Sequence, residues 1–467
     1  MPIKIYNSLT RKKDDLKPLK KDSIKMYVCG PTVYDEPHIG HARSAYIFEV
    51  IRRYLEYKKL KVTFVKNVTD VDDKIIEKAK KVFAGEDLNE AVKKVSAKYL
   101  EAYHRDMEEL GIKRPDKEPK ATEYIGKMIG FIEKLIERDA AYVSDGDVYF
   151  NIKKAEKYGK LSGQSLDKME VGARVSSGEN KRDALDFALW KKAKEGEPLW
   201  DSPWGKGRPG WHIECSVMSS DILGDEFDIH GGGIDLIFPH HENEIAQSEA
   251  AGKKFAKVWM HHGLLTINNQ KMAKSLGNFI TIKDFVNKYH DLDFLKFFFL
   301  TTHYAHPADF SGEKIKETRE SLERIMIFLN KSKKEVCSTG HSHKKIKEIE
   351  GLRHKFEEAM DVDFNTPRAV ACIFELVNIA NKKMEDSGFV CVAAATIKEL
   401  LLFFGISPEK GEPGGSADLE INTKIVERNV ARQNKDYALS DKIRVELESK
   451  GIILEDTKDG TTWRRKI

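Results

Sequence analysis

Residues 24–65 contain the pattern that most constrains the fold: strand, loop, helix, strand. The segments 24–29 (Ile-Lys-Met-Tyr-Val-Cys) and 61–65 (Lys-Val-Thr-Phe-Val) have the composition of short buried strands, and apolar residues recur at helical spacing over 45–55. Such a βαβ unit predicts an open, mostly parallel sheet covered by helices. Ligands of these sheets bind at the carboxyl ends of the strands, which is where Cys29 and the loop after it lie.

The length of 467 residues is too great for one hydrophobic core and predicts several domains. A hairpin is expected over residues 141–150, and we expect the strand pattern to resume near Trp211 and again at residues 227–233. The expected fold class is α/β, with a Rossmann-like parallel-sheet domain that is split by an insertion and followed by helices. The expected boundaries are residues 1–312 for the sheet domain, with its insertion at about 119–205 and a loop region at about 262–312, residues 313–405 for a helical bundle, residues 406–417 for a Gly- and Pro-rich linker, and residues 418–467 for a small terminal module.

The composition is typical of a folded, water-soluble protein, with 40% hydrophobic and 33% charged residues. No secretory signal is visible, and no window approaches the roughly 18 consecutive apolar residues of a membrane span, so we expect a cytoplasmic monomer with no membrane partner. The net charge of +4 is weak evidence about partners. The five cysteines are scattered and odd in number, which argues against a disulfide framework and favours metal ligands or buried thiols.

Two histidines three residues apart, His38 and His41, precede the expected helix. Imidazole N–H groups and the N-terminus of a helix can both donate hydrogen bonds to phosphate oxygens, and Gly40 lets the backbone approach closely. Two nearby histidines alone are more often ordinary surface or core residues. Their place after a strand and at the start of a helix favours a triphosphate site.

A lysine-containing segment, residues 271–275 (Lys-Met-Ala-Lys-Ser), follows an expected hairpin whose polar tip is Asn268 and Asn269. Two lysines on a mobile loop, Lys271 and Lys274, can neutralise the charge that develops as pyrophosphate leaves ATP. Taken alone, such a segment is more often a solvated charged turn. Its occurrence after the histidine pair, in that order, favours an ATP site.

Four residues of zinc-binding types lie in three separate segments: Cys29, Cys215, and His240 with Glu244. On a helix that begins just before His240, positions i and i+4 share one face, so His240 and Glu244 can hold the same ion. Two thiolates, one imidazole and one carboxylate suit Zn²⁺.

Spacing alone does not select this set of ligands. Each cysteine can instead be a buried structural thiol. His241, paired with Glu244 or with Glu242, is a competing choice that helical periodicity does not exclude.

Together, the histidine and lysine segments resemble the two signatures of class I aminoacyl-tRNA synthetases, with Ala273 where that class usually has serine. Residues 27–35 (Tyr-Val-Cys-Gly-Pro-Thr-Val-Tyr-Asp) and 227–233 (Phe-Asp-Ile-His-Gly-Gly-Gly) resemble segments of the cysteinyl-tRNA synthetase family. The resemblance extends over about residues 3–467. It implies that L-cysteine is ligated to tRNA(Cys) through a cysteinyl-adenylate, with ATP·Mg²⁺ as substrate and one Zn²⁺ per chain.

The resemblance also implies a role for each candidate residue. The zinc ligands are Cys29, Cys215, His240 and Glu244; the catalytic residues are His38, His41, Lys271 and Lys274; the nucleotide is contacted by Gly40, His230, Gly231, Gly232, Gly233 and Lys274; and the cysteine pocket contains Trp211 as a wall and Thr69 as a contact to the amino or carboxylate group. A zinc ion lowers the pKa of a bound thiol far more than that of a serine hydroxyl, so selection at binding removes the need for editing. Each pocket residue has an ordinary alternative as a core tryptophan or a loop glycine.

Residues 418–467 carry 11 Lys/Arg and 10 Asp/Glu, so composition alone describes a solvated helical module rather than a basic patch. The segment resembles the anticodon-binding end of cysteinyl-tRNA synthetases, and the bundle before it resembles their tRNA-binding helical domain, including residues 364–368. Four of its side chains have groups that can stack on single-stranded bases or form hydrogen bonds with their edges: Arg432, Asp441, Asp456 and Trp463.

Two alternatives keep parts of this pattern. A ligase of the same fold that joins cysteine to an amino sugar would share the zinc and ATP motifs but lack the terminal module. A catalytically inactive paralogue that binds RNA would be expected to lose signature residues, whereas both signatures and all four ligands are present.

Overall fold

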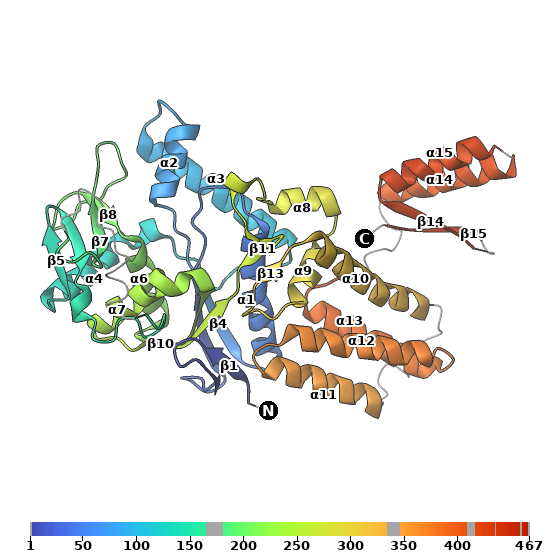
Figure 1. The fold of residues 1–467 in the computed structure, drawn as a ribbon, viewed down its shortest axis with the longest axis horizontal. Helices are drawn as coiled ribbons and strands as arrows, with labels where there is room; N and C mark the ends of the chain where they lie inside the picture. Colours follow the sequence, from blue (N-terminus) through green and yellow to red (C-terminus); the bar gives the residue numbers. More distant parts are fainter. Residues whose placement is uncertain are drawn as a thin grey trace.

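A four-stranded parallel sheet in the order β10-β9-β3-β4 forms the centre of the computed structural model, which describes residues 2–164, 181–333, 346–408, 416–434, 436–457 and 460–465 (Figure 1). The strands are β3 (Ser23–Val28), β4 (Lys61–Lys66), β9 (Glu226–Gly233) and β10 (Phe255–His262). The expected α/β class is confirmed. Because β3 lies between β4 and β9, the strand order reverses beside it, and such a reversal opens a ligand crevice at the carboxyl ends of the strands.

Helices carry the chain between these strands and around them. They are α1 (Ile39–Tyr57), α2 (Asp73–Val82), α3 (Leu88–Glu109), α4 (Ile125–Glu137), α6 (Trp211–Leu223) and α7 (Glu242–Ala250). Helix α1 is the βαβ crossover expected from the sequence, and it contacts β4, β9 and β11. A short hairpin of β1 (Lys4–Asn7) and β2 (Lys12–Asp15) precedes the sheet.

The insertion forms its own antiparallel sheet with α4 and α6 beside it. Its strands are β5 (Ala141–Ser144), β6 (Asp147–Phe150), β7 (Phe187–Lys192) and β8 (Gly207–Pro209). The hairpin expected over residues 141–150 is confirmed. The strand expected near Trp211 is wrong, because Trp211 begins α6. The buried positions of this helix include polar residues such as Glu214 and Ser216, so its sequence lacks the apolar stripe that identifies an amphipathic helix.

The lysine-containing segment extends from a small sheet beside the main one. This sheet consists of β11 (Leu265–Ile267), β12 (Gln270–Lys271) and β13 (Ala308–Asp309), and helices α8 (Ile282–Tyr289) and α9 (Leu292–Leu300) lie between β12 and β13 in the chain. The turn at Asn268 and Asn269 has positive φ angles of 50° and 61°, which asparagine tolerates better than most residues. The expected polar hairpin tip is confirmed.

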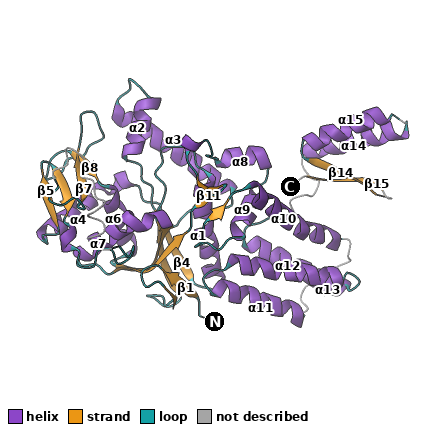
Figure 2. Cartoon of the chain, in the orientation of Figure 1, coloured by secondary structure: helices purple, strands orange, loops and turns teal. Residues whose placement is uncertain are grey.

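Beyond residue 311 the chain is mostly helical, as expected (Figure 2). The bundle consists of α10 (Gly312–Ser332), α11 (Lys347–Asp361), α12 (Thr366–Lys382) and α13 (Ser387–Phe403), and the terminal module of α14 (Ser416–Gln433), α15 (Tyr437–Ser449), β14 (Ile452–Thr457) and β15 (Gly460–Arg465). Residues 409–415 of the expected linker lie outside the described residues. Its first residue, Ile406, is buried.

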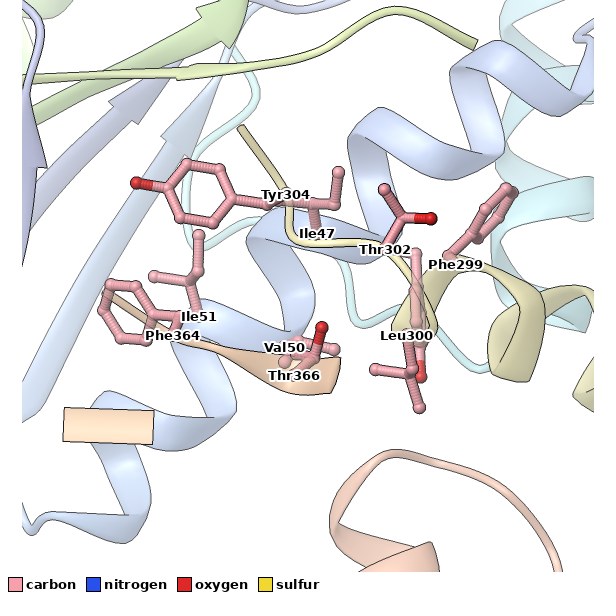
Figure 3. Close-up of a pocket in the computed structure, with 10 residues that line it drawn as sticks. Ile47, Val50, Ile51, Phe299, Leu300, Thr302, Tyr304, Phe364 and Thr366 are labelled. Carbon is pink, nitrogen blue, oxygen red and sulfur yellow. The ribbon is translucent and has the colours of Figure 1, made fainter. Parts of the chain in front are cut away.

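The bundle packs directly onto α1, so that the sheet domain and the bundle share one core. The Tyr46 hydroxyl donates to the carbonyl of Phe404 at 2.8 Å, and the Tyr54 hydroxyl donates to the Asp361 carboxylate at 2.7 Å. A cavity of only about 20 Å³ remains at this junction, where side chains of α1 meet Leu300 and Phe364 (Figure 3). This close packing fixes the position of α1, whose N-terminal end carries the two histidines.

One cysteine departs from the expectation of free thiols, because Cys391 on α13 is disulfide-bonded. Cys29, Cys215 and Cys372 are free. Among the described helices, none has both the length and the apolar composition needed to cross a membrane.

Candidate active site

A cleft of about 520 Å³ opens at the carboxyl ends of the central strands. Its walls include His38 and His41 from the start of α1, Lys271 from the small hairpin, Cys29 from the end of β3, and Trp211 from α6. Residues more than 200 positions apart in the sequence therefore share one cavity, as the predicted ATP and metal sites require.

The two histidines cap the helix that they begin. His38 is the N-cap residue of α1, and its Nδ1 accepts hydrogen bonds from the backbone N–H groups of Gly40 at 3.1 Å and His41 at 3.3 Å. His41 Nδ1 accepts in return from the His38 N–H at 3.2 Å, which completes a reciprocal capping box. Since Nδ1 is an acceptor in both rings, the proton of each neutral imidazole lies on Nε2.

Both imidazoles are neutral at physiological pH. Burial, together with the nearby charge of Lys274, lowers the pKa of His38 to about 4. Burial and His38 lower the pKa of His41 well below its usual value. The rings stack with centroids 3.7 Å apart, and two positively charged imidazolium rings would repel each other at this distance. The pair can thus donate hydrogen bonds to phosphate, but the positive charge must come from lysines or a metal ion.

The two signature lysines occupy different surroundings. Lys271 lines the cleft, whereas the Lys274 ammonium forms an ion pair with Asp35 and lies 4.9 Å from the centre of the Phe279 ring. Asp35 Oδ1 also forms an ion pair with the Lys78 ammonium at 3.4 Å. Partial burial opposes ionisation of Asp35, but the Lys274 hydrogen bond and the charge of Lys78 outweigh it and lower the pKa of Asp35. Lys274 is thus held on the carboxylate of Asp35, the residue after Tyr34, which lines the cleft.

The four predicted metal ligands converge at the inner end of the cleft. Their donor atoms all lie within 4.8 Å of one another. The Sγ atoms of Cys29 and Cys215 are 3.7 Å apart, and His240 Nε2 lies 3.1 Å from Glu244 Oε1. Tetrahedral zinc, with bonds of about 2.3 Å to sulfur and about 2.0 Å to nitrogen or oxygen, separates such ligand pairs by about 3.8 and 3.3 Å. The donor set and its spacing fit Zn²⁺.

A competing set of Cys29, His230, His241 and Glu244 has similar spacing. In this set, however, His230 Nε2 lies 2.8 Å from Glu244 Oε2, the carboxylate oxygen that the first set leaves free. His241 lies 3.2 Å from Cys29 Sγ through Nε2, while its Nδ1 lies 2.8 Å from His261 Nε2. These contacts are those of histidines that orient metal ligands through hydrogen bonds. The first set uses both thiols and leaves these partners in place, so the geometry favours it.

Without a cation, the ligand group is electrostatically unfavourable. Burial raises the pKa of Glu244 well above its usual value, and burial with the neighbouring thiol raises the pKa of Cys29. Burial also raises the pKa of Cys215 and lowers that of His240. A bound dication would oppose the shifts of the two thiols and the carboxyl and reinforce that of His240, because it favours thiolate, carboxylate and neutral imidazole together.

The two predicted cysteine-pocket residues flank the metal group. Trp211 is 39% exposed, lines the cleft and stacks on His240 with ring centroids 4.1 Å apart. Thr69 is buried, and its hydroxyl donates to Glu214 Oε2 at 2.7 Å. The hydroxyl oxygen of Thr69 is therefore available only as an acceptor, which suits an ammonium group better than a carboxylate.

The glycine segment differs in part from the sequence prediction. Gly233 lines the cleft, but a Cβ at Gly231 would lie 2.3 Å from the Phe48 ring, and a Cβ at Gly232 would lie 2.7 Å from His241. These two glycines are needed for packing inside the sheet. The His230 side chain is fully buried and directed at Glu244 rather than at the cleft, because successive side chains of a strand point to opposite faces.

The four residues expected to contact the anticodon lie in the terminal module. Arg432 is paired with Asp456 at 2.7 Å, and Arg428 binds the same carboxylate through two contacts of 3.0 and 2.9 Å. Asp441 is exposed on α15. Trp463 lies opposite Leu454 in the β14–β15 hairpin and packs against the apolar core of the module.

Sequence reasoning missed three polar residues that the structure places around the cleft. They are Asp35, which holds Lys274, Glu214, which accepts from Thr69, and Arg43, which is buried beneath the histidine pair. Arg43 and Glu214 are polar residues at buried positions of helices, and this departure from the apolar pattern is a signal that the sequence contained. Asp35 carried no comparable signal.

Comparison with protein families gives two matches. Residues 15–320 match the model described as "tRNA synthetases class I (C) catalytic domain", and residues 355–407 match the DALR domain. The first match covers the sheet domain with its insertion and the start of α10, and the second runs from the middle of α11 to just beyond α13.

Full-length relatives and solved structures agree with these matches. The chain is 48% identical to the cysteine–tRNA ligase of Geobacillus thermodenitrificans, over 99% of both chains, and 48% identical to that of Bacillus cereus, over 100% of both chains. Its fold is similar to a methionyl-tRNA synthetase of Mycobacterium tuberculosis solved with methionyl-adenylate, with a TM-score of 0.60 at 14% identity over 83% of this chain and 92% of that one. It is also similar to a putative arginyl-tRNA synthetase of Campylobacter jejuni, with a TM-score of 0.56 at 16% identity over 84% and 95% of the two chains.

Proposed function

The chain belongs to the cysteine–tRNA ligase family of class I aminoacyl-tRNA synthetases, and we propose on this basis that it ligates L-cysteine to tRNA(Cys) at the expense of ATP. The observation that carries the proposal is that the histidine signature, Lys271 and Cys29 line one cleft, and that the other three residues of the ligand group meet Cys29. The full-length match includes residues 418–467, so the amino-sugar ligase without that module is not favoured.

In the first step, the carboxylate of cysteine attacks the α-phosphorus of ATP·Mg²⁺, and pyrophosphate leaves. His38 and His41 donate Nε2–H hydrogen bonds to the phosphates from fixed positions on α1, and Lys271 and Lys274 neutralise the charge that develops on pyrophosphate. Lys274 must first leave Asp35, so triphosphate binding and closure of the lysine loop are coupled. No covalent bond to the enzyme is needed.

Selection of cysteine takes place at the ligand group. Cys29, Cys215, His240 and Glu244 would hold Zn²⁺, which when bound supplies a Lewis acid that prefers a thiolate to a hydroxyl. His230 and His212 fix the Glu244 and His240 side chains, with contacts of 2.8 and 3.0 Å. The Thr69 hydroxyl accepts a hydrogen bond from the substrate ammonium, and Trp211 forms the outer wall of the pocket.

In the second step, a hydroxyl of the terminal adenosine of the tRNA attacks the acyl carbonyl of the adenylate, and AMP leaves. The bundle and the terminal module would bind the tRNA, with Arg432, Asp441, Asp456 and Trp463 near the anticodon. Arg428 and Arg432 already bind the Asp456 carboxylate, so Asp456 would contact a base only in the orientation that these two arginines give it. We propose a cytoplasmic location, because the proposed partner is a tRNA, and we propose that the protein is a monomer.

The test is aminoacylation of a tRNA(Cys) transcript by the purified protein, with cysteine and serine compared at equal concentration. We expect charging with cysteine and a preference over serine of more than about a hundredfold, the limit that an apolar pocket alone reaches. Charging of neither amino acid, with retained RNA binding, would instead identify a catalytically inactive paralogue.

A further inference from the structure

Arg43 is a buried cation without a buried anion. It lies on α1 two residues after His41, and its side chain is 1% exposed. Within the described ranges no carboxylate lies at ion-pair distance from its guanidinium, and burial lowers its pKa to about 10. A buried charge of this kind is retained only where its hydrogen bonds fix something in place.

The guanidinium binds backbone carbonyls of two segments that meet at the base of the β11–β12 hairpin. Nη1 donates to the carbonyls of Gly263 and, at 2.9 Å, Leu264. Nη2 donates to the carbonyls of His306 at 2.6 Å and Tyr304 at 3.4 Å. The first segment leads into the hairpin that carries Lys271, and the second returns the chain to β13.

The two segments are in close contact at this point. The Gly263 N–H donates to the Tyr304 carbonyl at 2.9 Å, and Ala308 donates to Leu264 at 3.0 Å. A Cβ at Gly263 would lie 2.3 Å from the backbone of His306, so only glycine fits there. Arg43 therefore binds both segments at a tightly packed crossing.

The far end of the lysine loop is fixed to the same helix. The Ile39 N–H donates to the Ile280 carbonyl at 3.1 Å, the Ile282 N–H donates to the Pro37 carbonyl at 3.1 Å, and His38 pairs with Thr281. The segment from residue 265 to residue 279 thus runs between two attachment points on α1. One is the start of the helix, and the other is the Arg43 side chain.

We propose that Arg43 is a positioning residue that sets the distance between the two ATP signatures, so that Lys271 and Lys274 close onto the phosphates held by His38 and His41. This inference rests on the proposed function and deepens it. The planar guanidinium reaches four carbonyls from one fixed position, whereas a lysine ammonium keeps the charge but is a single point with three donors. Lysine at this position therefore leaves the charge in place and loosens one attachment point of the loop.

The test compares Arg43→Lys with Arg52→Lys in cysteine-dependent ATP–pyrophosphate exchange. Arg52 is a matched control, because it lies on the same helix, is 7% exposed and binds a backbone carbonyl and two carboxylates away from the cleft. We expect Arg43→Lys to lose about 10- to 100-fold in kcat, the effect of a displacement of about 1 Å, with the KM for cysteine changed by less than about twofold. Arg52→Lys should retain the wild-type kcat at a comparable melting temperature.

A second variant separates positioning from folding. In Arg43→Ala, millimolar guanidinium should restore part of the lost kcat, and it should have no such effect on Arg52→Ala. The proposal is overturned if Arg43→Lys is as active as Arg52→Lys, if its loss follows the unfolded fraction, if guanidinium restores nothing, or if neither Arg43 variant folds. Absence of exchange in the unmodified protein would overturn the proposed function instead.

Discussion

Individual side chains at the inner end of the cleft depend on one another for their chemistry. Cys29 and Cys215 lie 3.7 Å apart, and each would be an inert buried thiol on its own. The two carboxylate oxygens of Glu244 have different partners: Oε1 lies 3.1 Å from His240 Nε2, and Oε2 lies 2.8 Å from His230 Nε2. A residue of this group therefore cannot be replaced without leaving the others as buried, uncompensated polar groups.

Replacing Cys215 with serine should remove the metal and the activity together. We expect one zinc per chain in the unmodified protein by elemental analysis, little in Cys215→Ser, and a loss of more than about a hundredfold in cysteine-dependent exchange, because the set loses one of its two soft ligands. Cys372→Ser is the matched control, since this free, half-buried thiol lies on α12 outside the site, and it should keep both zinc and activity. Unchanged exchange in metal-free protein would rule out the zinc site.

His262 should make stability depend on pH between about 7 and 4. Burial lowers the pKa of His262 to about 4, below its unfolded value of about 6.5. In this window the unfolded state binds more protons than the folded state, so the free energy of unfolding falls as the pH falls.

For this single histidine the loss between pH 7 and pH 5 is about 2 kcal/mol. His262→Asn can keep the hydrogen bond to the Gly263 carbonyl but does not titrate, so urea unfolding at the two pH values should show a smaller pH dependence by about this amount. An equal pH dependence in both proteins would contradict the assignment.

At the scale of elements, the start of α1 has a structural and a chemical function in the same residues. The spacing of three between His38 and His41 is that of a capping box, and the structure confirms the reciprocal bonds. The cap uses Nδ1 of each ring, which leaves Nε2–H for the substrate. Helix capping thereby fixes the tautomer and the direction of both proposed phosphate donors.

The two functions of His38 can be separated by substitution. In His38→Asn the amide oxygen can still cap α1, so the free energy of unfolding should change by less than about 1 kcal/mol, but the Nε2–H donor is lost and kcat of exchange should fall by about 100-fold or more. In His38→Ala both the cap and the donor are lost, and stability should fall by about a further 1 kcal/mol. Denaturation and exchange are measured on the same preparations. Wild-type exchange in His38→Asn would show that the ring has only a structural function.

At the scale of the whole molecule, the proposed sites of activation and of tRNA recognition lie in separate parts of the chain. The cleft draws all its lining residues from positions 29–272, and the bundle packs beside α1 (Figure 1). The terminal module has its own small core and an ion-pair group around Asp456, whose pKa is held well below its usual range by Arg428. Substitutions in this module should therefore affect only the second step.

Arg432→Ala tests this separation. Arg432 is exposed, and loss of one contact to an unstacked base costs about 1–3 kcal/mol, so we expect kcat/KM for tRNA charging to fall about tenfold or more. Pyrophosphate exchange without tRNA should stay within about twofold of the unmodified protein. Arg428→Ala serves as the comparison, because Arg428 is 3% exposed and its loss should destabilise the module itself. Equal charging by Arg432→Ala and the unmodified protein would remove Arg432 from the anticodon contacts.

Local periodicity and spacing within a few residues were enough to predict the parallel sheet, the hairpins, the bundle and the place of the two signatures in the chain. The same local information failed at Trp211, because the helix that begins there buries polar residues and so has no apolar stripe at helical spacing.

The tertiary packing, and not any local pattern, brings the donors of the ligand group together. Cys29, Cys215 and His240 come from three elements, and only the sheet order brings them together, so spacing could not choose between His240 and His241. It also decided that His230 faces Glu244 and that Arg43 binds carbonyls more than 200 residues away. Long-range contacts of this kind depend on how the elements pack, and no local pattern in the sequence contains that information.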